Sequence, residues 1–239
     1  MLTIARHELT QILRNRAVLV SGLVIPFAVS ASLVWRHETF ENIGSLGYLA
    51  STIVLTIAAF SLYSTVVTTL ASRRQNLFLK RLRSTAARDH EILWGLVLPA
   101  TAIAGVQLLG ILAVLAAVAG SPDNSLLFAA GTLATIAMML GLGLATAGLT
   151  HSPEHAQVTT LPISLGTIAV GVWVGITGTE NLATVKRLLP GGAATELMTD
   201  AWNGGASVVD SLVLLAPTLA WVFLALFLAQ RLFQWEPRR

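Results

Sequence analysis

The chain has 239 residues, of which 54% are hydrophobic and only 11% are charged, and its mean hydropathy is +0.73. About a quarter of the residues of a soluble domain are charged, so this composition excludes a water-exposed globule and favours a protein surrounded by lipid. Cysteine is absent, which excludes disulfides and thiolate chemistry. The net charge of +3 comes mainly from basic residues beside apolar runs, where such residues orient membrane spans rather than bind nucleic acid.

Residues 1–16 form a basic amphipathic segment ahead of the first long apolar run. Its apolar residues recur at helical spacing, at Leu2, Ala5, Leu9, Ile12 and Leu13. A helix of this kind lies in the membrane interface. Three arginines before an apolar run also fit a cleaved signal peptide, with Ala28-Val29-Ser30 as a possible cleavage site. We favour a retained cytoplasmic interfacial helix, because the segment before the apolar run is long and itself patterned.

Six apolar stretches are long enough to cross a bilayer, which takes about 20 residues. They are residues 17–35, 45–71, 92–119, 125–150, 158–177 and 211–233. A helix satisfies its backbone hydrogen bonds within its own segment, whereas the strands of a membrane barrel are shorter and alternate in polarity. The sequence therefore predicts an all-α integral membrane protein, in which residues 17–239 form a six-helix transmembrane domain.

Twelve of the fifteen Lys and Arg residues fall on one side of this topology. They lie in residues 1–16, between spans two and three, and from the end of span six to the carboxyl terminus. The other side holds Arg36, Lys186 and Arg187. Because basic loops stay in the cytoplasm, we expect a multi-pass protein of the cell membrane with both termini cytoplasmic. The Ala-, Leu- and Arg-rich usage points to a bacterial inner membrane.

The longest external segment, residues 178–210, contains a further helical pattern. Its apolar positions are Ala194, Leu197, Met198, Ala201 and Trp202. Glu196 and Asp200 lie on the other side of this pattern. The stretch is too short to span a bilayer, so we expect short external helices between spans five and six, resting at the outer surface.

Motifs for catalysis and for metal binding are missing. No G-x-x-x-x-G-K-[ST] phosphate loop occurs, and His90-Glu91 lacks the second histidine of an HExxH motif. The five histidines are scattered over both sides, so we expect neither a metal site nor catalytic residues. The interior of the six spans holds no Asp, Glu, Lys or Arg, which argues against an ion-coupled transporter. The sequence thus predicts neither an enzyme nor a cofactor bound to this chain.

The most specific feature is the cytoplasmic segment between spans two and three. It reads RRQNLFLKRLRST from Arg73 to Thr85 and EILWG from Glu91 to Gly95. A plain positive-inside loop would account for its charge. The segment also has a helical pattern, with Leu77, Phe78, Leu82 and Thr85 on one side. An apolar stripe flanked by charges favours binding to a partner surface.

This segment resembles the corresponding loop of the ABC-2 type permease family, the membrane subunits of bacterial ABC exporters of the drug, antibiotic or peptide type. In that loop an arginine-rich run ending in Lys-Arg-Leu-Arg precedes a Glu-Ile-Leu segment and the third helix. The predicted layout of the whole chain is similar to that family too. Two departures are Thr85-Ala86-Ala87, where the family usually has Thr-Pro-Leu, and the lack of a Ser-Gly pair and following proline in residues 166–178.

The resemblance implies that residues 73–91 form a coupling helix that contacts a separate ABC ATPase subunit. The residues that it assigns to this contact are Arg73, Arg74, Leu77, Phe78, Lys80, Arg81, Leu82 and Arg83. His151, Glu154 and His155 would form a second, smaller cytoplasmic contact. The resemblance also implies two ATPase copies carrying ATP and Mg²⁺, and a second permease, identical or different, with the substrate route between the two permeases.

The predicted function is therefore the permease subunit of an ATP-driven exporter. Spans rich in Val, Leu, Ala, Gly, Ser and Thr offer no fixed charge, so we expect an apolar or amphipathic substrate, such as a drug, antibiotic, peptide or lipid-like molecule. Gln107, near the middle of span three, is a candidate for the substrate path, although a buried interhelical hydrogen bond is its commoner role.

The alternative function for the chain is a non-catalytic membrane scaffold or a passive channel without an ATPase partner. An intramembrane enzyme would need polar catalytic pairs at depth, and none is visible.

Overall fold

The computed structural model describes residues 2–42, 45–85, 87–204, 207–233 and 235. These residues are overwhelmingly helical and include no β-strand, which confirms the all-α prediction. Five helices among them are long and apolar enough to cross a membrane: Leu46–Gln75, Asp89–Ala119, Ser125–Leu149, Pro153–Thr177 and Val208–Leu232. They match expected spans two to six, so the chain is a multi-pass membrane protein. Ala86, Arg238 and Arg239, used in the sequence arguments, lie outside the described residues.

The first expected span consists of shorter pieces. After α1 (Leu2–Arg14) come α2 (Arg16–Leu19), the π-helix η1 (Val20–Val24) and α3 (Ile25–Trp35). The apolar helix over Val20–Trp35 is shorter than the five others. A count of six spans and an interfacial position for residues 1–16 therefore stay predictions.

The second expected span is the central element of the bundle. It runs without a break through α5 (Leu46–Thr56), the π-helix η2 (Ile57–Tyr63) and α6 (Ser64–Gln75), and most of its side chains are buried. Gly22 of η1 lies against the central span, where an added Cβ would stand only 2.5 Å from Oγ1 of Thr65 in α6 and 4.0 Å from the carbonyl oxygen of Phe60 in η2. A side chain at this position would force η1 away from the central helix.

Three of the remaining long helices begin at a side chain that caps the first backbone N–H groups. The side chain of Asn124 accepts a hydrogen bond from the backbone N–H of Leu127 at the start of α9 (Ser125–Leu149). Ser152 and Ser207 cap α10 (Pro153–Thr177) and α13 (Val208–Leu232) in the same way. These bonds satisfy backbone donors that a helix start leaves without partners. The glycine-rich face of α9 packs on α13, with Gly141 against Ala225.

The helix expected to rest on the outer surface is instead inserted into the bundle, so that expectation was wrong. α12 (Gly192–Asn203) packs against α5, α9, α10 and α13, and its predicted apolar face is buried. Glycines on the surrounding helices allow this approach. A Cβ on Gly47 would stand 2.5 Å from the carbonyl oxygen of Thr199, and one on Gly131 would stand 2.9 Å from the side chain of Met198.

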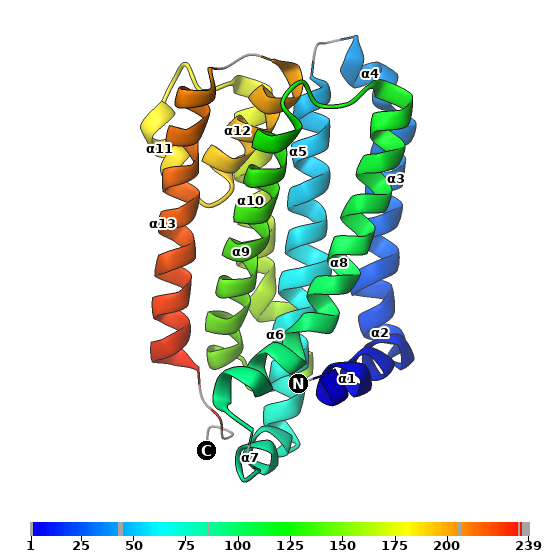
Figure 1. The fold of residues 1–239 in the computed structure, drawn as a ribbon, viewed down its shortest axis with the longest axis vertical. Helices are drawn as coiled ribbons and strands as arrows, with labels where there is room; N and C mark the ends of the chain where they lie inside the picture. The colour runs from blue at the N-terminus through cyan, green and yellow to red at the C-terminus, as the bar shows by residue number, and fades with distance from the viewer. Residues whose placement is uncertain (1, 43–44, 86, 205–206, 234, 236–239) are drawn as a thin grey trace.

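The predicted cytoplasmic and external segments lie at opposite ends of the bundle. Figure 1 shows α1, α7 (Phe78–Arg83) and the carboxyl end of α13 at one end. It shows α4 (His37–Glu41), α11 (Ala183–Leu188), α12 and the turn between α8 (Asp89–Ala119) and α9 at the other. The basic segments thus share one end, as the topology requires. Which end faces the cytoplasm stays a prediction.

Candidate functional site

The expected coupling segment forms a short helix folded back against the bundle. α6 ends at Gln75, Leu77 takes a left-handed backbone with φ of 56°, and α7 follows. Leu79 is fully buried and belongs to the same hydrophobic core as Ile92, while Phe78 and Leu82 pack beside them. The apolar side of α7 therefore faces the protein. Sequence reasoning missed Leu79, although it lies within helical reach of Leu82.

The outward side of α7 is basic, with one exposed leucine. Leu77 is 46% exposed, and Lys80, Arg81 and Arg83 are exposed as well. Arg81 donates to the carbonyl of Asn76 at 2.8 Å, and Arg83 contacts Asp89 at 3.2 Å. An exposed ion pair of this kind contributes about 0–1 kcal/mol, so Arg83 can exchange Asp89 for a group on a partner at little cost. The structure thus divides the eight expected residues between an inward set and an outward set.

Arg73 joins α6 to α1. Its Nε and Nη2 donate to Oε2 and Oε1 of Glu8, both at 2.9 Å, and the side chains are only 13% and 3% exposed. The guanidinium also lies 5.6 Å from the ring centre of Phe78 at the start of α7. One arginine therefore holds α1, α6 and α7 together.

Arg74 points the other way and is almost fully buried. Its guanidinium donates to the carbonyl oxygens of Gly148 and Thr150, at the end of α9. Thr150 in turn shares a hydrogen bond of 2.9 Å with Thr159 of α10. Of the eight expected residues, Arg74 is thus the one that connects the α6–α7 segment to the turn between α9 and α10.

That turn carries the second expected contact. His151 lies in the turn, and Glu154 and His155 follow in the first turn of α10. All three are exposed, and the two histidine rings stand 5.6 Å apart between their centres. The turn begins directly after Thr150, the residue that Arg74 binds. The structure therefore brings the two expected contact segments together through one buried arginine.

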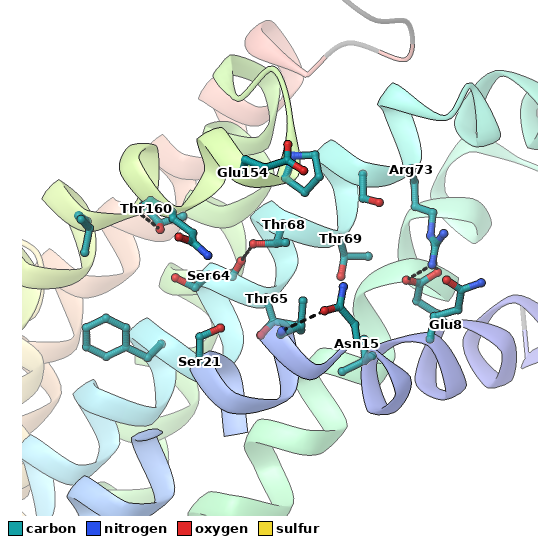
Figure 2. Close-up of a pocket in the computed structure, with 18 residues that line it drawn as sticks. Glu8, Asn15, Ser21, Ser64, Thr65, Thr68, Thr69, Arg73, Glu154 and Thr160 are labelled. Carbon is teal, nitrogen blue, oxygen red and sulfur yellow. Dashed lines mark hydrogen bonds and ion pairs between the residues drawn. The ribbon is translucent and has the colours of Figure 1, made fainter. Parts of the chain in front are cut away.

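A cavity of about 370 Å³ opens beside this junction, between α1, α2, η1, η2, α6 and α10 (Figure 2). One face of α6 lines it with five hydroxyl groups, from Ser64, Thr65, Thr68, Thr69 and Ser72. Their spacing of three to four residues places them on one side of a helix. The central span is therefore polar on the one face that borders this cavity.

The facing elements add amides and charges to the cavity wall. Gln11, Asn15 and Ser21 come from the amino-terminal region, and Glu154, Gln157 and Thr160 come from α10. Glu8 and Arg73 also line it, so their ion pair forms part of the wall, as Figure 2 shows. In each of these elements, polar residues recur at helical spacing. This pattern is visible in the sequence and could have indicated a polar cavity, but the sequence-based prediction for the spans rested on charged residues.

Gln107 does not line this cavity. Its Nε2 donates to the carbonyl oxygen of Leu23 in η1 at 2.9 Å, and the side chain is buried. The structure therefore places Gln107 in a hydrogen bond between α8 and η1. Its part in a substrate path stays a prediction.

At the opposite end, an ionic cluster fixes α11 to α12. Arg187 donates to both carboxylate oxygens of Glu196, at 2.7 and 2.6 Å, and Thr179 donates at 2.7 Å. Burial alone would raise the pKa of Glu196, but the hydrogen bonds from Arg187 and Thr179 outweigh it and hold that pKa below its usual value. Burial, helped by nearby Glu196, raises the pKa of Asp200. This cluster stabilises the packing of α11 on α12.

The sequence was compared with known families and proteins. A family model described as ABC-2 family transporter protein matches residues 20–229, most of the chain. Proteins of that family are membrane components of transporters that lack a nucleotide-binding domain of their own and typically work with an ABC ATPase. Among curated proteins the comparison found no match.

Proposed function

Because the chain belongs to the ABC-2 family of transporter proteins, we propose that it is the permease subunit of an ATP-driven exporter. The working unit has two ABC ATPase subunits, which carry ATP and Mg²⁺, and a second permease. It moves an amphipathic substrate out of the cytoplasm. The observation that carries this proposal is the pair of adjacent arginines that ties the basic α6–α7 segment to α1 and to the α9–α10 turn.

The outward side of α7 is the surface that contacts the ATPase. Leu77 supplies an exposed apolar group, and Lys80 and Arg81 supply positive charge around it. His151, Glu154 and His155 form the smaller second contact on the neighbouring turn. Both contacts then move as one body, because Arg74 connects them.

Movement of α7 passes into the membrane through α6. Arg73 transmits it to α1, and α6 continues directly into η2 at the buried centre of the bundle. A π-helical turn departs from regular α-helical hydrogen bonding and often occurs at functional sites. η2 is accordingly the point at which α5 and α6 can bend relative to each other.

Two matched leucine variants test the ATPase contact. Leu77 and Leu182 both have a left-handed backbone, with φ of 56° and 59°, and both precede a six-residue helix, but they lie at opposite ends of the bundle. Leu77→Asp should abolish copurification of the ATPase in mild detergent, and Leu182→Asp should preserve it. If Leu77→Asp still binds the ATPase, the contact assignment is wrong. If the unaltered chain binds no ATPase, the scaffold or passive channel is the better description.

Topology can be tested on the natural background, because the chain has no cysteine. Ser84 and Ser121 are exposed serines at the α7 end and at the opposite end. In spheroplasts, a membrane-impermeant maleimide should label Ser121→Cys at once and Ser84→Cys only after permeabilisation. Labelling of Ser84→Cys from outside would refute the coupling proposal, since the ATPase is cytoplasmic.

A further inference from the structure

The hydroxyl groups on the cavity face of α6 differ in how they are bonded. Thr68 donates to the carbonyl of Ser64 at 2.8 Å, within its own helix. The hydroxyls of Thr65, Thr69 and Ser72, by contrast, make no hydrogen bond to another described residue. Thr65 and Thr69 are buried as whole residues, but their hydroxyl oxygens border the open cavity and are not sealed inside the protein. These hydroxyls are therefore available to a molecule in the cavity.

The charge of the cavity wall selects among possible molecules. The positive charge of Arg73 is already neutralised by Glu8 in a two-point contact. Glu154 is exposed at the wall and forms no ion pair with any described residue. Since an exposed glutamate is ionised at neutral pH, the described residues of the wall carry one more negative than positive charge, and none of them is an unpaired cation. An anionic group would be repelled there, whereas hydroxyl, amide and ammonium groups would find acceptors.

The cavity also has an apolar edge towards the surface that lipid covers. Leu161 lines it, and Leu165, one turn further along α10, is 53% exposed. A molecule with its polar group among the α6 hydroxyls can therefore lay an alkyl chain along α10. This arrangement fits an amphipathic molecule better than a fully apolar one.

We propose that this cavity binds the head group of the exported amphipath, and that the head group is rich in hydroxyl or amine groups and carries no negative charge. The proposal narrows the substrate class and depends on the proposed transport function for the molecule's role as substrate. Because Arg73 both lines the cavity and contacts Phe78 of α7, movement of the ATPase-binding helix would reach the cavity wall directly.

Three amphiphiles with the same dodecyl chain test the head-group selection: the maltoside, the primary ammonium salt and the sulfate. Saturable binding of each radiolabelled probe is measured below its micellar concentration on the full chain in lipid nanodiscs, with empty nanodiscs as the partition control. We expect the maltoside and the ammonium to bind, and the sulfate to bind at least tenfold more weakly. Equal binding of the sulfate, or no saturable binding of any probe, overturns the proposal.

Variants locate the binding to this cavity. Thr65→Val and Thr69→Val, which keep shape and remove one hydroxyl each, should weaken maltoside binding about threefold to tenfold. Thr101→Val is the matched control, because Thr101 lies outside the cavity and bonds within α8. Glu154→Gln should weaken the ammonium and spare the maltoside. Unchanged affinities in the threonine variants refute the site. The assay uses no ATPase, so its failure is distinguishable from failure of the Leu77 copurification test.

Discussion

The ion pair between Glu8 and Arg73 fixes α1 to the central helix, so Glu8→Ala should release α1 locally. Removing one member of a buried ion pair costs about 3–5 kcal/mol, because the other charge is left without a partner. The lower end applies here, since Arg73 borders an open cavity and is 13% exposed. A cost of about 3 kcal/mol corresponds to roughly a hundredfold change in an opening equilibrium. Alanine favours helix more than glutamate does, so a loss of intrinsic helicity cannot cause the effect.

Amide hydrogen exchange measured on nanodisc-embedded protein provides the assay. Exchange in residues 2–14 should accelerate roughly a hundredfold in Glu8→Ala. The opening is local, because it exposes only the contacts of α1, such as those of Ala5 and Ile12, so α9 should keep its protection. The charge-swapped double variant Glu8→Arg/Arg73→Glu should recover part of the protection. Asp89→Asn is the control, because it breaks the exposed Arg83–Asp89 pair and should change little. Unaltered exchange of α1 in Glu8→Ala would show that the ion pair does not hold this helix.

Two further predictions concern the inserted helix α12. Gly47→Ala should lower the stability measured by thermal denaturation by about 1–3 kcal/mol, because the new Cβ would stand 2.5 Å from the carbonyl oxygen of Thr199. Gly105→Ala, the control with open space around the new Cβ, should be neutral or stabilising in that assay. Asp200→Asn should raise the denaturation temperature at pH 7 and not near pH 3. A carboxyl whose pKa is higher in the folded than in the unfolded state loses stability as pH rises from about 4, and an amide avoids that loss. A lower denaturation temperature for Asp200→Asn at pH 7 would contradict this sign.

The long helices could be predicted from the sequence because their apolar runs are long enough to cross a bilayer. Hydropathy does not show where a helix begins, since capping side chains such as Asn124, Ser152 and Ser207 determine those positions. The predicted span of residues 125–150 differs from α9 by one residue at its end. The span of residues 158–177 starts five residues inside α10, because hydropathy does not register the polar first turn of a helix.

Features that depend on contacts between distant segments could not be predicted in this way. The burial of α12 requires Gly47 on α5 and Gly131 on α9 to present flat surfaces to it, and no local pattern in residues 192–203 reveals that. The π-helical turns η1 and η2 likewise lie in mostly apolar sequence that gives no sign of π-helical bonding, and Gly22 marks only a close approach of η1 to the central span. An amphipathic pattern therefore identified α12 correctly and its position wrongly.

The candidate site shows why a run of basic residues was informative as a whole and misleading residue by residue. Consecutive residues on a helix point about 100° apart, so Arg73 and Arg74 at the end of α6 must face different neighbours. α6 is the central helix, and different elements lie on its two sides: α1 receives Arg73, and the α9–α10 turn receives Arg74. Two adjacent arginines at the end of a central span can thus hydrogen-bond to two different peripheral segments. This does not depend on the surface that the following residues present. The charge of the run favours cytoplasmic placement, but its first two members act inside the protein, and only exposed residues after Gln75, such as Leu77 and Arg81, are placed to meet another subunit.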